Sequence, residues 1–267
     1  MLSSIFAKGI RDQRRSLLAW VVGIAAYVAL LCAVYPAVQK SAGSLNQYLQ
    51  NLPSAFRNAF LGGSVDFSSP AGFIDTELFS FMGPILILVF AVGFGARAVA
   101  GEEEAGTLDM VLAYPVSRRS VILQKFAVLI VMVIAFTLAL FVSMVIGTQA
   151  AGMGVATGRL LQASVLLGLL GLLFGSVAFV AAAASGRRVV GISAGGGLAW
   201  VFYLMNALGQ LVHSIHGVRV ASPFYYYGGA APLVRGLDAA NVAIFLVATV
   251  LALAAALVAF QRRDLQS

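Results

Sequence analysis

Charged side chains are scarce in this sequence. Only 10% of its 267 residues are charged, whereas 61% are hydrophobic, and the mean hydropathy is +0.96. Soluble domains carry about 25% charged residues, so this chain has too few of them to cover a soluble globular surface. We therefore expect an integral membrane protein in which residues 1–267 form a single transmembrane domain.

Cysteine and lysine are also rare, and their scarcity excludes several kinds of chemistry. The single cysteine, Cys32, lies in an apolar stretch, which rules out a disulfide or a cysteine-based metal site within one chain. A P-loop needs a lysine directly after a glycine so that the lysine meets the phosphates. None of the three lysines, Lys8, Lys40 and Lys125, follows a glycine, so we expect no nucleotide site in this chain.

The two histidines, His213 and His216, do not support a metal site either. They stand three residues apart where few acidic residues are near, and the sequence contains no HExxH motif. We expect no catalytic residue, no metal and no cofactor in this chain, which is therefore not an enzyme. The formal net charge of +7 is explained by membrane topology rather than by nucleic-acid binding.

Long apolar runs dominate what the sequence does contain. Six of them reach about 20 residues, the length that a helix needs to cross a bilayer core, and none contains Asp, Glu, Lys or Arg. Backbone in a bilayer must satisfy its own hydrogen bonds, which favours an all-α protein with six transmembrane helices. The predicted spans are residues 17–38, 78–96, 126–148, 160–184, 189–212 and 239–260.

The lysines and arginines between these spans predict the orientation. With the N-terminus in the cytoplasm, twelve of them fall on the cytoplasmic side and five on the outer side. Basic residues collect on the cytoplasmic side of membrane proteins. We expect a multi-pass protein of the cell (cytoplasmic or inner) membrane, surrounded by lipid, with both termini in the cytoplasm.

Three segments beside the spans also carry structural signals. Residues 1–16 place apolar side chains such as Phe6 and Ile10 at helical spacing among basic ones, which predicts an amphipathic elbow helix at the inner interface or, alternatively, a charged tail. Between spans one and two we expect two short helices separated by Pro53. Between spans five and six, a Gly- and Pro-rich segment predicts a broken region that is either re-entrant or interfacial.

One internal loop, residues 97–125, concentrates charge that the rest of the chain lacks. An acidic cluster leads to a glycine, a capping threonine and a short apolar pattern that a proline ends, which predicts a short amphipathic helix under the bundle. Such a helix fits docking to a cytoplasmic partner; the alternative is a solvated loop held at lipid headgroups. The candidate coupling residues are Glu102, Glu103, Glu104, Gly106, Thr107, Leu108, Val111, Leu112, Pro115, Ser117 and Arg118.

Polar residues inside the spans are few, and span five offers the best run of them on one helical face. Tyr203, Asn206, Gln210 and His213 follow one another at intervals of three, four and three. Polar groups in a membrane face a cavity or a neighbouring helix, so this face is a candidate lining for a substrate path or a site of interhelical hydrogen bonds. Small residues predict close helix packing in spans four and five: Gly171, Gly175, Gly191 and Gly195.

The stretch "GEEEAGTLDMVLAYPVSRRSVILQKF" resembles the loop between the second and third spans of ABC-2 type ABC transporter permeases. The residues that carry the resemblance are Glu102, Glu104, Gly106, Thr107, Leu108, Pro115, Ser117, Arg118 and Lys125. The elbow, the six spans and the broken segment before the last span extend the likeness over most of the chain.

This resemblance implies a transmembrane subunit that is driven by a separate cytoplasmic ABC ATPase, with the loop as the coupling helix. It also implies complexes of two ATPases, which bind ATP and Mg²⁺, and two permease chains, either a homodimer or two sister subunits. Because the spans lack charge, we expect export of a hydrophobic or amphipathic compound such as a drug, antibiotic or lipid. The alternatives are a secondary transporter or channel that needs no ATPase, and a membrane anchor or assembly factor that recruits a cytoplasmic partner.

Overall fold

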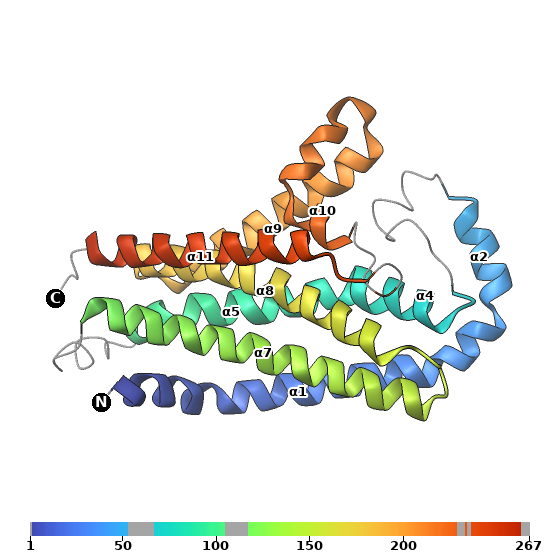
Figure 1. Ribbon diagram of the computed structural model, residues 1–267, viewed down its shortest axis with the longest axis horizontal. Helices are drawn as coiled ribbons and strands as arrows, with labels where there is room; N and C mark the ends of the chain where they lie inside the picture. The colour runs from blue at the N-terminus through green and yellow to red at the C-terminus, as the bar shows by residue number, and fades with distance from the viewer. Residues whose placement is uncertain (1, 53–66, 105–116, 229–232, 234–235, 263–267) are drawn as a thin grey trace.

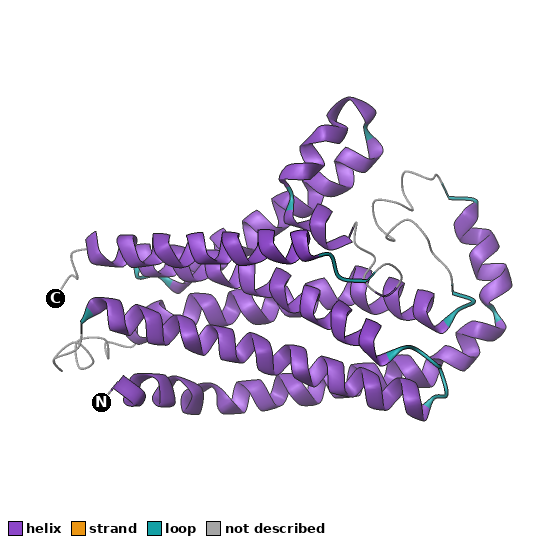
Figure 2. Cartoon of the chain, viewed as in Figure 1, coloured by secondary structure: helices purple, strands orange, loops and turns teal. Residues whose placement is uncertain are grey.

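The computed structural model describes residues 2–52, 67–104, 117–228, 233 and 236–262. This part of the chain is almost entirely helical and contains no strand (Figure 2). Within it, six helices are long and apolar enough to cross a membrane, which confirms the predicted all-α fold with six spans. The candidate spans are Ile5–Lys40, Pro70–Gly101, Arg118–Ala150, Thr157–Ser185, Arg188–Leu211 and Ala239–Arg262.

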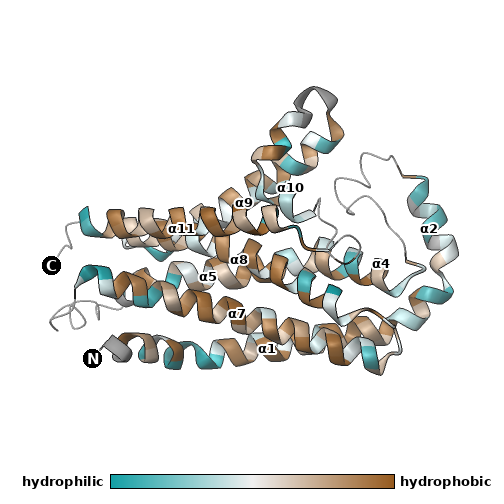
Figure 3. Ribbon diagram, viewed as in Figure 1, coloured by the Kyte–Doolittle hydropathy of each residue, from teal (hydrophilic) through white to brown (hydrophobic). Residues whose placement is uncertain are grey.

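The long helices lie side by side in an elongated bundle (Figure 1). They are α1 (Leu2–Lys40), α5 (Gly83–Glu104), α7 (Arg118–Ala150), α8 (Thr157–Ser185), α9 (Arg188–Leu211) and α11 (Ala239–Arg262). We call the end of the bundle where α1, α7 and α9 begin and α5, α8 and α11 end the terminal end; the sequence predicts that this end faces the cytoplasm. Apolar residues cover most of each long helix, and hydrophilic ones gather near the helix ends (Figure 3).

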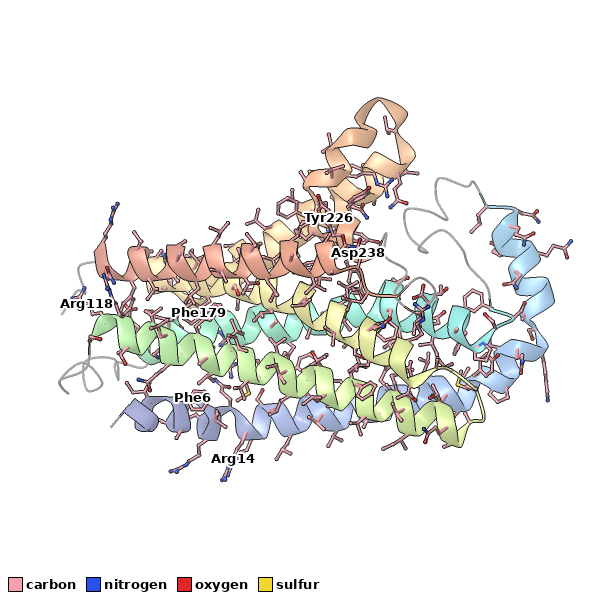
Figure 4. All side chains as sticks on the ribbon, viewed as in Figure 1. Phe6, Arg14, Arg118, Phe179, Tyr226 and Asp238 are labelled. Carbon is pink, nitrogen blue, oxygen red and sulfur yellow. The ribbon has the colours of Figure 1, made fainter. Side chains whose placement is uncertain are left out.

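The first helix corrects the prediction of a separate elbow. Residues 2–40 form one continuous helix, so the amphipathic segment is the first part of the spanning helix. The reason is local, since no glycine or proline interrupts residues 10–22. Its apolar side packs on α7: Phe6 lies between the two helices and its backbone N–H donates to Gln124 Oε1 at 3.2 Å, whereas Arg14 points away (Figure 4).

The second span begins earlier and ends later than predicted. Ser69 caps the short helix α4 (Pro70–Ile74), where the Ser69 hydroxyl accepts the Gly72 N–H at 3.1 Å and Pro70 occupies the first turn. A π-helix, η1 (Asp75–Met82), follows and runs directly into α5. The acidic residues Asp75 and Glu77 therefore lie on the same continuous helical rod as the apolar span.

Helix α8 is the centre of the bundle and packs against α5, α7, α9 and α11. Small residues allow these close approaches. A Cβ added at Gly175 would lie 2.9 Å from the Ala91 carbonyl of α5, and one added at Gly195 of α9 would lie 2.8 Å from Ala178 Cβ of α8. Aromatic side chains fill the wider gap between α1, α5 and α7, where Phe90 contacts Phe136 at a ring-centroid distance of 4.7 Å.

Short helices connect the spans at the end opposite to the terminal end. The first of the two predicted between spans one and two is α2 (Ala42–Gln50), and the second falls on residues 53–66, outside the described part. The break before the last span contains a 3₁₀-helix, η2 (His213–Ala221), and the short helix α10 (Pro223–Gly228). Phe224 and Tyr227 of α10 are buried, and α10 packs against α8 and α9, so this part of the segment enters the bundle.

Candidate functional site

At the terminal end, the last residue of α5 contacts the first residue of α9. Glu104 Oε1 accepts a hydrogen bond from the Arg188 backbone N–H at 2.7 Å, across 84 positions of sequence. A carboxylate bonded to a backbone N–H at a helix start is favourable because it meets both an unsatisfied donor and the positive end of the helix dipole. The acidic cluster thus makes a contact inside the chain as well as a charged surface.

The turn between α8 and α9 explains why that donor is available. Gly186 ends α8 in the left-handed conformation, at φ 69°, which favours glycine. Arg187 then occupies the N-cap of α9 in an extended conformation and makes no side-chain cap. At the start of α7, by contrast, the Ser117 hydroxyl accepts the Ser120 N–H at 3.3 Å. Helix α9 receives its cap from α5 instead.

The structure describes only the two ends of the predicted coupling loop. The side chains of Glu103, Glu104, Ser117 and Arg118 are described, and the side chain of Glu102 is not. Arg118 is the first residue of α7 (Figure 4). The remaining candidate coupling residues lie outside the described part: Gly106, Thr107, Leu108, Val111, Leu112 and Pro115.

Lys125, which the sequence marked only through a resemblance, is buried where α5 and α7 meet. Its side chain is 6% exposed, and its Nζ donates to the Ala98 carbonyl at 2.7 Å. A buried ammonium group must be hydrogen-bonded, so this contact holds α7 to the last part of α5. Beside it lies a pocket of about 190 Å³, which Asp12 and Arg97 also line.

The polar face of α9 carries three of its four predicted residues. Tyr203, Asn206 and Gln210 are all half-buried. Helix α9 ends at Leu211 and Val212 is extended, so His213 starts the 3₁₀-helix η2 and does not continue the α9 face; its side chain is outside the described part. The prediction that His213 shares a helical face with the other three residues is therefore wrong, because α9 ends before His213.

The segment that contains η2 and α10, which we call the returning segment, brings residues to this face that spacing along the sequence did not identify. Arg219 of η2 donates from Nε to Asn206 Oδ1 at 3.5 Å, and its guanidinium lies 5.3 Å from the centre of the Tyr225 ring. The Tyr203 ring meets Phe224 of α10 edge-on at 5.6 Å. In the sequence, the three consecutive tyrosines at 225–227 indicate that this segment lies near the membrane surface. Only the fold shows which helices the segment contacts.

Tyr227 is the deepest contact of the returning segment. Its hydroxyl donates to the Phe79 carbonyl in η1. That carbonyl is available because Gly83 N–H donates to Leu78 instead, and Pro84, which stands five residues after Phe79, has no N–H. Burial, with a further contribution from Asp75, holds the pKa of Tyr227 well above its ordinary value, so the phenol stays protonated and able to donate.

A family model described as ABC-2 family transporter protein matches residues 3–265. The chain belongs to this ABC-2 family. A curated relative, the probable ABC transporter permease protein NosY of Pseudomonas aeruginosa, is 32% identical over 163 residues. That match covers 57% of this chain and 55% of the relative, so it spans about half the length of each protein.

Family membership confirms the resemblance that the charged loop carried. An ABC-2 chain whose described part contains six long apolar helices is a multi-pass membrane protein.

Proposed function

We propose that this chain is the membrane subunit of an ABC-2 exporter for a hydrophobic or amphipathic compound, driven by a separate ATPase subunit. The observation that carries the proposal is the charged loop itself. Its acidic start closes α5, its Ser-Arg end opens α7, and both ends lie at the terminal end of the bundle. The short helix that the sequence predicts between these ends would be joined on both sides to spanning helices, so that movement of a bound partner would reach both of them.

The distribution of basic residues supports a cytoplasmic partner at this end. Lys8, Arg97, Arg118 and Arg262 belong to the twelve basic residues on the side that the sequence predicts to be cytoplasmic. ATP and Mg²⁺ would bind in the ATPase, because none of this chain's lysines stands in a P-loop. Two ATPases and two permease chains, identical or sister subunits, would make up the complex.

The exposed apolar side chains of α9 support a cargo path that this chain forms together with a second permease chain. Large apolar side chains on α9, including Trp200 and Val201, are exposed in the single chain, and the half-buried polar groups of the same helix are few. A surface of this kind accepts lipid or another apolar helix. Tyr203, Asn206 and Gln210 are the residues that we expect to meet the polar part of an amphipathic compound.

Co-purification tests the proposal. The wild-type chain should co-purify from its native membrane with an ATPase, and Leu108→Asp should abolish this association while the chain remains folded, because a carboxylate would replace an apolar docking group. Val218→Asp, which puts a carboxylate at an exposed apolar residue of η2 at the opposite end of the bundle, is the control and should keep the ATPase bound.

Two results would contradict the proposed function. One is an ATPase that remains bound and coupled in the Leu108→Asp variant. The other is solute transport by the purified chain alone in liposomes without nucleotide, which would make it a secondary transporter or channel.

A further inference from the structure

We propose that Glu104 is a positioning residue that ties the end of α5 to the start of α9, so that movement of the coupling loop reaches the helix with the polar face. This inference rests on the proposed function only for the origin of the movement. The contact itself, Glu104 Oε1 with the Arg188 N–H at 2.7 Å, is a property of the chain alone.

The negative charge of Glu104 is favourable at its position only because the start of α9 lies next to the end of α5. A carboxylate at the C-terminus of α5 faces the negative end of its own helix dipole, which is unfavourable, whereas at the N-terminus of α9 the same charge is favourable. The first turn of any helix leaves backbone N–H groups without a helical partner. At α9 the N-cap residue is Arg187, whose side chain offers no acceptor, so the carboxylate from α5 fills that role.

Packing beyond this contact lets α5 and the first half of α9 move together. A Cβ at Gly191 would lie 2.9 Å from Ala96 Cβ of α5, and one at Gly195 would lie 3.2 Å from Val92 Cγ1. These close approaches hold the two helix surfaces in contact along the first half of α9. Glu104 adds a directional bond at the end of the pair.

Glu104 also stands at the entrance of the loop in which the family resemblance places the coupling helix. A displacement of that loop would act first on the end of α5. The bond to Arg188 would pass it to α9, a continuous helix that carries Tyr203, Asn206 and Gln210 further along. Glu104 is thereby assigned to transmission inside the permease rather than to the surface that meets the ATPase.

The first test uses the chain alone, in lipid nanodiscs, with amide hydrogen exchange as the measurement. Glu104→Ala should raise exchange in peptides that cover the start of α9 by about tenfold, because a charge-assisted hydrogen bond and a helix cap are both lost. Glu104→Gln keeps a side-chain oxygen acceptor at the same position and is the matched control, in which exchange should rise less than in Glu104→Ala. Equal exchange in wild type and Glu104→Ala would overturn the contact.

The second test removes the donor instead of the acceptor. Arg188→Pro deletes the backbone N–H at a first-turn position that proline tolerates, and Arg187 before it already has the extended conformation that proline requires, at φ −119° and ψ 121°. Arg188→Ala is the matched control, since it loses the same side chain but keeps the N–H.

Movement is read from spin labels in the complex with the co-purified ATPase. Labels replace the exposed Leu208 of α9 and Ile146 of α7, in a Cys32→Ser background that removes the native thiol. ATP should shift the distance between the labels in Arg188→Ala, and Arg188→Pro should reduce that shift at least about twofold while the ATPase stays bound.

An equal shift in the two variants would overturn the role in transmission. Failure of the wild-type chain to bind any ATPase would instead refute the proposed function, and the exchange experiment would still decide whether the contact exists.

Discussion

The two halves of α9 have different surroundings although they belong to one helix. The first half packs against α5 and α8 through Gly191 and Gly195, with neighbouring atoms close enough to crowd any added Cβ. The second half extends away from the bundle toward η2 and α10 (Figure 1). Its contacts are side-chain interactions with the returning segment, such as Tyr203 with Phe224.

Within the first half, a glycine is needed for packing only where a neighbouring helix lies close to it. Gly195 lies against Ala178 and Phe174, whereas a Cβ added at the adjacent Gly196 or Gly197 would have no atom within 4 Å. Close packing against α5 and α8 holds the first half of α9 in place. Individual polar and aromatic side-chain contacts hold the second half. Substitutions at packed and at open positions should therefore differ in how much they lower the stability of the protein.

The largest effect is expected from Gly195→Leu. Its side chain would meet the backbone and side chains of α8, and overpacking of this kind costs about 3 kcal/mol. Gly196→Leu, one residue on, points to open space and should leave stability within about 0.5 kcal/mol of wild type. Chemical unfolding in detergent micelles measures both. Equal losses in the two variants would show that packing against α8 does not set Gly195 apart from its open neighbour in the same half of α9.

Tyr227→Phe should have the next largest effect. It keeps the ring in its buried place but leaves the Phe79 carbonyl without its phenol donor, which should lower the free energy of unfolding by about 2 kcal/mol. Tyr226→Phe in the same helix is the control and should change stability little, because Tyr226 is only half-buried. An unchanged Tyr227→Phe variant would show that the returning segment is held by packing alone.

Ser222→Ala should cost less, about 1 kcal/mol. The buried Ser222 hydroxyl donates to the Phe202 carbonyl of α9 at 2.7 Å and also accepts the Phe224 N–H at 3.2 Å. Ser193→Ala, in the first half of α9, replaces an exposed hydroxyl and should be neutral. A comparable loss at Ser193 in thermal unfolding would mean that hydroxyl bonds stabilise both halves of the helix.

Asn206→Leu should have the smallest effect on stability and a clear effect on selectivity. Asn206 is half-buried and its bond to Arg219 is long, at 3.5 Å, so unfolding should change by less than about 0.5 kcal/mol. The set of amphipathic compounds that stimulate ATP hydrolysis by the complex should change. A loss of assembly with unchanged selectivity would return Asn206 to a packing role.

Much of the fold followed from the sequence because the bilayer limits the possible structures. An apolar run of about 20 residues can only be a helix there, so all six spans were predicted and their ends moved by a few residues at most positions. The exceptions had local causes. Nothing interrupts the helix between Ile10 and Leu17, so the predicted elbow is part of α1. Ser69 and Ser117 cap the helices of the second and third spans well before the predicted apolar runs begin.

The candidate site was predicted less completely. Helical spacing correctly placed Tyr203, Asn206 and Gln210 on one helix. It was wrong for His213, because α9 ends at Leu211 and the spacing of residues in the sequence does not show where a helix ends. Arg219 was missed because it lies in another element, and no pattern along the chain indicates which helix a returning segment will contact.

The sequence by itself determined the membrane setting, the helical class, the family and the absence of a nucleotide-binding lysine. These follow from composition, run length and a local motif, which are all properties of neighbouring residues. Only the tertiary structure decided that Glu104 caps α9, that Lys125 bonds to Ala98 and that Tyr227 bonds to Phe79. Each of these joins a side chain to a backbone group far away in the chain, and such a partner becomes available only where the packed helices begin, end or change their hydrogen-bond pattern.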